Sequence, residues 1–431
     1  MRIALPLAGT RGDVQPAVAL GVELRGRGHD VVIGAPPNLV DFATRAGLET
    51  QACGPDVQKL YESDEGQRAL ASGSTFKLMP MVAKQMAEYT DRFDDEMIDV
   101  CSGADLIVST TMTEDRGQSI AEAMSIPLVS LHTFPCRKNS KYPFPNGLPP
   151  QWSPPGPVNS ATWVVAENVR RVVFMKYLNK LRAKLDLPST RQSVAAALHR
   201  DGVPEVQIYD PVLLPGLADE WAGQRPFTGF LELTRATREA VGELADAHDD
   251  VLSWIAAGPP PIYFGFGSMP IRDATTVVAQ VDDVTRRLGQ RALVSAGWSD
   301  LDRANAATGD HVKIVGALAH DIVFQHCAGA VHHGGVGTLF ESLRAGLPTM
   351  VCSVSFEQPM WGTQVERLGL GSHVRFTKLD AATLESGLRV LLEDATIEHA
   401  RDMGAQLAKS AQACAAVADI VEAHAAKWEA K

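Results

Sequence analysis

Residues 331–359, VHHGGVGTLFESLRAGLPTMVCSVSFEQP, contain a complete strand–turn–helix–strand unit. A short apolar strand ends in the pair His332 and His333, and a glycine-rich turn follows it. Apolar positions then recur with helical spacing to about Ala345, where Gly346 predicts the end of the helix. A second apolar strand follows at residues 349–354. This order of elements is typical of a parallel α/β fold.

The glycine turn of this unit also predicts a ligand site. Gly335 and Gly337 leave room for a ligand beside the backbone, and Thr338 lies in the first turn of the helix. Free N–H groups and the positive end of the helix dipole suit a phosphate. The opposing interpretation is an ordinary turn that opens a helix. Adjacent histidines are also found in zinc pairs and in cores, but no third ligand stands at a suitable spacing, so we predict no metal site.

Three further polar residues follow in the same unit. Glu341 comes one helical turn after Thr338, on the same face. Glu357 and Gln358 follow the second strand, at the edge where ligands of open α/β sheets bind.

The same alternation of short apolar strands and helices extends over the whole chain and predicts two Rossmann-like, doubly wound domains that face each other across a cleft. We expect an N-terminal domain at 1–212, a linker at 213–235 and a second domain at 236–408. A C-terminal helix is expected at 409–431, for which packing back on the N-terminal domain is one arrangement. Strands are expected at 2–8, 30–35, 105–110, 127–132, 261–268, 291–297, 312–318, 329–335 and 349–354.

Composition restricts the class of protein. The 431 residues are 45% hydrophobic and 21% charged, as in globular proteins, and the net charge of −11 argues against nucleic acid as a partner. The sequence shows no signal-peptide core, no apolar run long enough to span a membrane, and six scattered cysteines without a CxxC pair. We expect a cytoplasmic protein without stable membrane insertion, and peripheral membrane contact stays open.

The chain begins with a second glycine turn, GTRGDVQP at residues 9–16, after the first strand. Arg11-Gly12-Asp13 resembles an adhesion tripeptide, but adhesion does not fit a cytoplasmic protein. Thr10 and Asp13 have the spacing of a capping box, so a helix cap is one interpretation of Asp13. The other is a reacting carboxylate at the cleft. A helix N-terminus lowers the pKa of a carboxylate, which predicts a weak base at rest.

Together these segments resemble the UDP-glycosyltransferase superfamily, whose fold is called GT-B. The likeness is to the branch that contains bacterial glycopeptide-antibiotic glycosyltransferases and sterol glucosyltransferases. It is carried by HHGGVGT, LRAGLP, the pair Glu357 and Gln358, the run ALAHDIVFQHCAGAVHHGG, FGFGSM at 264–269 and GTRGDVQP.

The resemblance implies a role for each matching position. Glu341 would hold the ribose of a nucleotide sugar, and Glu357 and Gln358 would bind the sugar hydroxyls. Val315 and Leu318 would flank the base of the nucleotide. The diphosphate would be bound by His333, Ser268, Thr338, Gly335 and Gly337.

The reaction implied is inverting, metal-independent transfer of a hexose to an acceptor hydroxyl, with no cofactor other than the nucleotide sugar. Asp13 is the candidate general base, because no histidine lies in residues 1–28. UDP-glucose is the donor expected, with a dTDP-deoxysugar as the alternative. A nucleotide-sugar epimerase on the same fold and a non-catalytic sugar-nucleotide binding protein are the other functions considered. A Rossmann oxidoreductase is disfavoured because residues 9–14 do not fit GxGxxG.

The acceptor region is predicted from its apolar composition. Eight prolines fall in residues 135–157, and long apolar helices are expected near 76–100 and 160–185. Such a loop inside an α/β domain is often functional, so we expect a lipophilic acceptor of the sterol, polyketide, flavonoid or glycolipid type. The candidate acceptor-site residues are His132, Phe134, Met79, Met86 and Phe144. His132 has two interpretations, a cleft residue beside Asp13 and an ordinary polar residue at a strand end.

Overall fold

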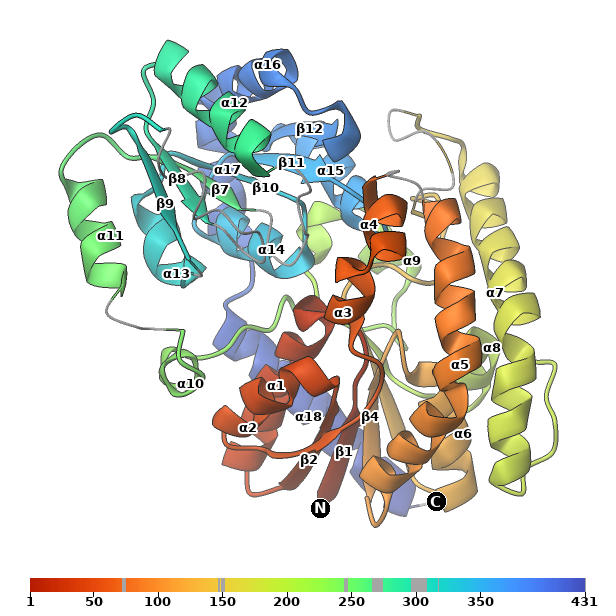
Figure 1. Cartoon of the computed structure of the whole chain (residues 1–431). Helices are drawn as coiled ribbons and strands as arrows, with labels where there is room; N and C mark the ends of the chain where they lie inside the picture. The colour runs from red at the N-terminus through yellow and green to blue at the C-terminus, as the bar shows by residue number, and fades with distance from the viewer. Residues whose placement is uncertain are drawn as a thin grey trace.

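The computed structural model describes residues 1–71, 75–145, 148, 152–243, 247–265, 274–295, 308–316 and 318–430. Two six-stranded parallel sheets, one above the other in Figure 1, form the centres of two α/β halves. The predicted fold class is therefore confirmed.

The first sheet has the strand order β3-β2-β1-β4-β5-β6. Its strands pack on both faces, since Ile3 and Leu5 contact one apolar cluster and Ala4 contacts another. This two-sided burial explains the continuous apolar runs of the central strands. The strands are β1 (Arg2–Pro6), β2 (Asp30–Ala35), β3 (Glu49–Ala52), β4 (Leu106–Thr110), β5 (Leu128–His132) and β6 (Glu205–Gln207).

The second sheet has the order β12-β11-β10-β7-β8-β9, which repeats the arrangement of the first in a later part of the chain. In each sheet the strand order reverses beside the first strand, between β1 and β4 and between β7 and β10. Ligands of doubly wound sheets bind at such a switch point. The strands are β7 (Ile262–Gly265), β8 (Ala292–Ser295), β9 (Val312–Val315), β10 (Gly329–His332), β11 (Thr349–Ser353) and β12 (Gly371–Arg375).

Helices cover both faces of each sheet (Figure 1). In the first half they are α1 (Arg11–Gly26), α2 (Val40–Arg45), α3 (Val57–Glu62), α4 (Asp64–Ala71), α5 (Thr75–Cys101), α6 (Glu114–Met124), α7 (Gly156–Lys184) and α8 (Val194–Arg200). Between the sheets lie α9 (Leu217–Glu220) and α10 (Arg235–Ala240). The second half has α11 (Ala247–Ala256), α12 (Ala274–Arg287), α13 (His320–Val323), α14 (Val336–Arg344), α15 (Gln358–Arg367), α16 (Ala381–Leu391), α17 (Asp394–Gln406) and α18 (Ser410–Glu429).

The last helix, α18, lies against the first sheet rather than the second (Figure 1). Its buried residues Val417 and Val421 share an apolar cluster with Ile3 and Leu5 of β1. The segment between the sheets is itself a packed core, in which Leu217 and Phe230 contact Phe340 of α14 and Trp361 of α15. These contacts join the segment between the sheets to the second half.

Two local features concern the site. The first helix begins at Arg11, so Asp13 lies inside its first turn. Residues 266–273, which follow β7 and include Ser268, lie outside the described residues, and the predicted role of Ser268 stays a prediction.

Candidate functional site

The turn between β10 and α14 leaves the N-terminal end of α14 without a side-chain cap. Gly335 occupies the cap position, and no side chain of the described residues caps it. A Cβ at Gly335 would lie 2.4 Å from Nε2 of His333, so this position excludes a larger residue. Thr338 is half-buried in the first turn of α14. The backbone N–H groups of this turn are thus available to an anion.

His333 lies buried beside this turn, and its Nδ1 has no hydrogen-bond partner among the described residues. Burial, together with the charge of His320, lowers the pKa of His333 to about 4. The ring is therefore neutral at pH 7 and can donate one hydrogen bond to a ligand. Its neighbour His332 is a core residue, because its Nδ1 accepts from the N–H of Gly334 at 3.0 Å.

Glu341 lies on the next turn of α14, and both of its oxygens have partners. Nη2 of Arg238, on α10, donates to Oε1, and Nδ1 of His320 lies 2.7 Å from Oε2. Burial would raise the pKa of Glu341, but the hydrogen bond from His320 and the charge of Arg238 hold it well below its usual value. The carboxylate is therefore ionised, and a ribose would have to share it with these two residues.

Gln358 and Glu357 begin α15, directly after β11. The side-chain oxygen of Gln358 accepts from the N–H of Val354 at 2.9 Å and so fixes the turn, which leaves the amide group for a ligand. Phe356, just before Glu357, has a φ of 55°, an unusual conformation for an aromatic residue. Burial, together with the charge of Asp13, raises the pKa of Glu357 to about 7.

Asp13 lies at the carboxyl end of β1, in the first turn of α1. The N–H of Thr10 donates to Oδ2 of Asp13 at 2.8 Å, so the predicted capping box forms. Gly9 has a φ of 111°, and a Cβ there would lie 2.3 Å from the same oxygen. The glycine is therefore required for the carboxylate to take this position.

The expectation of a low pKa for Asp13 is wrong. Burial raises its pKa to about 6, and the hydrogen bonds from Thr10 oppose this rise without cancelling it. The side chain keeps an accessible edge on a cavity of about 10 Å³, which Thr110, Thr111 and Leu131 also line. This volume accommodates about one water molecule or one hydroxyl group.

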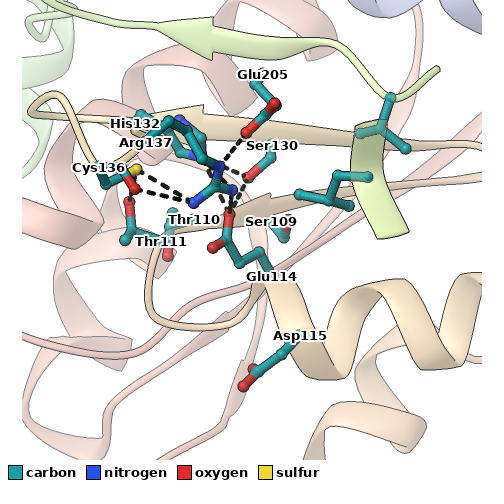
Figure 2. Close-up of polar contacts among 12 residues, drawn as sticks. Ser109, Thr110, Thr111, Glu114, Asp115, Ser130, His132, Cys136, Arg137 and Glu205 are labelled. Carbon is teal, nitrogen blue, oxygen red and sulfur yellow. Dashed lines mark hydrogen bonds and ion pairs between the residues drawn. The ribbon is translucent and has the colours of Figure 1, made fainter. Parts of the chain in front are cut away.

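His132 does not face this cavity. Its side chain is fully buried at the end of β5, where Ser130 and Glu114 lie 3.1 and 3.0 Å from Nε2 (Figure 2). Burial opposes the charged ring, yet Cys136 and Glu114 raise the pKa of His132 to about 9. The ring therefore belongs to a buried ionic cluster, and a part of His132 in shaping the acceptor site or orienting Asp13 stays a prediction.

The remaining candidates divide by location. Phe144 lines a second cavity, of about 40 Å³, together with Trp152 of the proline-rich loop and Met360 of α15. Phe134 is half-buried and packs against the core between the sheets. Val315 and Leu318 are half-buried at the end of β9 and beyond it. Gly337 has Phe230 at ordinary contact distance, and the side chains of Met79 and Met86 lie outside the described residues.

Two family models match separate parts of this chain, one in each half. The model of the glycosyltransferase family 28 N-terminal domain matches residues 3–142, and that of the erythromycin biosynthesis protein CIII-like C-terminal domain matches residues 299–426. An "uncharacterized glycosyltransferase" of Mycobacterium tuberculosis is 36% identical over 427 residues, which cover 98% of each chain. The chain belongs to the UDP-glycosyltransferase superfamily.

Two further proteins are similar to this glycosyltransferase over most of its length. A sterol 3-beta-glucosyltransferase of Arabidopsis thaliana is 29% identical over 409 residues, which cover 91% of this chain and 61% of that protein. The crystal structure of the calicheamicin glycosyltransferase CalG4 has a TM-score of 0.69 and 17% identity over 99% of this chain and 98% of that chain. The latter match shows that the two proteins share the GT-B fold.

Two residues that contact Glu341 had little signal in the sequence. Arg238 had no predicted role, and His320 was only part of the run ALAHDIVFQHCAGAVHHGG, which carries the resemblance to the family. Both contact Glu341, and Arg238 comes from a segment predicted to end the linker and open the second domain. His320 had a signal, the His-Asp pair before the histidine strand, whereas Arg238 had none. In the described part of the chain no helix is long and apolar enough to cross a membrane, and no group of three or more metal-ligating side chains occurs.

Proposed function

We propose that this glycosyltransferase transfers glucose from UDP-glucose to a hydroxyl group of a lipophilic small molecule, with inversion and without a metal ion. One observation supports the chemistry above all. Asp13 and Glu357 lie on opposite halves of the molecule and are half-buried, yet Asp13 acts electrostatically on Glu357. This coupling supports a reaction in which a carboxylate with a pKa near 6 acts beside the residues that would hold the sugar.

In the proposed reaction the acceptor oxygen attacks the anomeric carbon of the sugar. Its proton moves to Asp13, while the bond from the anomeric carbon to the phosphate oxygen breaks and UDP leaves with that electron pair. A single displacement inverts the configuration. A base whose pKa of about 6 lies just below neutral pH is both ionised and basic enough to help.

The charge of the leaving diphosphate would be stabilised by the uncapped end of α14 and by the unpartnered Nδ1 of His333. An anion at this position would favour protonation of His333, whose pKa is about 4 without one. Thr338 and Ser268 would add hydroxyl groups, and Gly335 and Gly337 would leave room for the phosphates.

Glu341 would bind the ribose, Glu357 and Gln358 the glucose, and Val315 and Leu318 would flank the uracil. The cavity lined by Phe144, Trp152 and Met360 supports a lipophilic acceptor, because it combines aromatic and apolar walls next to α15. Glucose as the sugar is supported by the similarity to the plant sterol 3-beta-glucosyltransferase.

A donor panel tests the proposal. Purified protein is incubated with UDP-glucose, other UDP-sugars or dTDP-sugars, with and without a mixture of sterols and phenols, in the presence of EDTA. We expect acceptor-dependent release of UDP from UDP-glucose and a product whose NMR spectrum shows a β-linkage. Turnover of dTDP-sugars alone would establish the alternative donor. Isomerised UDP-sugar without acceptor would establish an epimerase, and loss of turnover in EDTA would contradict a metal-independent reaction.

A further inference from the structure

Arg11 lies in the same helical turn as Asp13, but the proposed reaction assigns it no step. Its Nε donates to Oε1 of Gln15 at 2.9 Å, and its guanidinium lies over the ring of Phe42, 4.7 Å from the ring centre. These two contacts hold the side chain in one orientation. Nη2 then pairs with the carboxylate of Glu243, which follows α10.

Glu243 begins a line of charged groups that ends in the donor site. Its Oε2 lies 3.2 Å from Nη1 of Arg238, and Nη2 of Arg238 donates to Glu341. His320 lies 2.7 Å from the second oxygen of Glu341. The ion pairs therefore run without a gap from the turn that carries Asp13 to the carboxylate assigned to the ribose.

This line becomes more buried toward the donor site. The side chains of Arg238 and Glu341 are 4% and 5% exposed, that of Glu243 is 16% exposed, and that of Arg11 is 43% exposed. Partial desolvation of the guanidinium group, opposed by the charge of Glu341 and reinforced by that of Arg238, brings the pKa of Arg11 to about 10. Arg11 thus stays a cation at neutral pH and lies within the electrostatic reach of the donor site.

The two ends of α1 are held by different partners. Near the C-terminal end, Arg27 pairs with Asp419 and Glu422 of α18. Near the N-terminal end, Arg11 pairs with Glu243 and, through Arg238, with α14. The position of Asp13 over the donor half therefore depends on a contact that is built into the donor half itself.

We propose that Arg11 is a positioning residue, which holds Asp13 against the bound donor through the line Arg11–Glu243–Arg238–Glu341. The inference rests on the proposed function. A donor bound to Glu341 fixes the position of Arg238. Arg238 in turn fixes Glu243, and Glu243 fixes Arg11, because each neighbouring pair forms an ion pair. Asp13 then meets the acceptor only when the donor site is correctly occupied.

A double-mutant cycle tests this inference. The variants Arg11→Gln, Glu243→Gln and the double variant are compared with the wild type for kcat, for the KM of the acceptor, and for binding of UDP by calorimetry. We expect each single variant to lower kcat by about 5- to 30-fold while the Kd for UDP changes by less than about 3-fold. The double variant falls no further than either single one, because both break the same line.

Two more variants sharpen the test. Arg11→Lys keeps the positive charge but has a single ammonium nitrogen in place of the guanidinium group. We expect its kcat to lie between that of Arg11→Gln and that of the wild type. Arg45→Gln is the matched control, since Arg45 forms an exposed pair with Asp41 on the neighbouring helix, and it leaves kcat unchanged.

Two results would overturn the positioning role. One is a loss of kcat in the double variant equal to the product of the two single losses, and the other is a loss of UDP affinity as large as the loss of kcat. Failure of the wild type to bind UDP or to transfer sugar would instead contradict the proposed function. Normal transfer by Arg11→Gln contradicts the inference alone.

Discussion

Asp13 and Glu114 occupy matching places on neighbouring strands, yet their surroundings are opposite. Each follows a central strand of the first sheet, β1 or β4, and each lies in the first turn of the next helix, α1 or α6. Glu114 is completely buried and contacts Arg137 at 2.6 Å, His132 at 3.0 Å and Ser130 at 3.0 Å (Figure 2). Among the residues that the structure describes, the side chain of Asp13 accepts hydrogen bonds from the N–H and hydroxyl groups of Thr10 alone.

The two carboxyl groups consequently differ in proton affinity. Burial would raise the pKa of Glu114, but Arg137 and His132 hold it far below its usual value, whereas burial raises the pKa of Asp13 to about 6. Neighbouring cations, rather than position on the sheet, decide the difference. Glu114 is a fixed counter-ion that anchors the start of the proline-rich loop, and Asp13 is free to exchange a proton.

The largest expected effect is that of Asp13→Asn on catalysis. Removal of the base should lower kcat by about 10²- to 10⁴-fold. The amide can still accept from Thr10, so the free energy of unfolding should change by about 1 kcal/mol or less. Initial rates with UDP-glucose, UDP binding by calorimetry and urea unfolding check this. Near-normal turnover would show that Asp13 is only a helix cap.

The second expected effect is on stability, from Arg137→Met. This variant leaves Glu114 and Glu205 buried with fewer cations, which should destabilise the fold by about 3–5 kcal/mol. The matched control is Arg200→Met, which breaks the exposed pair with Asp201 and should cost about 1 kcal/mol or less. Urea unfolding compares the two. Equal stability of both variants would mean that the buried cluster is not structural.

The third prediction concerns the pH dependence of catalysis. Because Asp13 must be ionised to accept a proton, kcat/KM should fall about tenfold per pH unit below about pH 6. The residual kcat/KM of Asp13→Asn should not show this fall below about pH 6. If kcat/KM of the variant falls with pH in the same way as that of the wild type, a group other than Asp13 controls the pH dependence. Glu357, with a pKa of about 7, is the first candidate.

The smallest expected effect is on the pH dependence of stability. The pKa of Asp13 is raised on folding, so its contribution favours the folded state at low pH and is lost as pH rises through about 6. Relative to Asp13→Asn, wild type should therefore lose at most about 1.4 kcal/mol per pH unit between pH 4 and 6. Relative to Glu114→Gln, wild type should show the opposite slope at acid pH, because the pKa of Glu114 is lowered on folding. Urea unfolding at several pH values measures both differences in the free energy of unfolding. If the two differences changed with pH in the same direction, the contrast between Asp13 and Glu114 would be contradicted.

The strands that the sequence did not predict are short and carry polar residues. β3 and β12 are edge strands with the sequences ETQA and GSHVR, and they are only partly buried, so they lack the continuous apolar run of the central strands. β6 is fully buried but has only three residues, and its polar side chains Glu205 and Gln207 are paired with Arg137 and His132 inside the fold. The central strands, by contrast, were predicted to within a few residues.

The candidate site shows a similar division. The turn at Gly335 and the capping box of Thr10 and Asp13 could be predicted, because each depends on residues within a few positions of one another. The pairing of Arg238 with Glu341 joins residues 103 positions apart, and that of Arg137 with Glu205 joins residues 68 apart. No local pattern contains such a contact.

The sequence by itself therefore determined two doubly wound halves, a glycine turn suited to an anion and a carboxylate at the start of the first helix. Hydrophobic periodicity, the positions of glycines and the spacing of a capping box involve residues close together in the sequence. They therefore do not depend on contacts between the two halves. The tertiary structure alone decided that Glu114 is paired with Arg137, whereas no ion pair to Asp13 occurs within the described residues, and that Arg11 reaches the donor half. Proton affinity and position depend on distant groups that folding brings within a few ångströms, so the same residue type became a counter-ion in one place and a candidate base in the other.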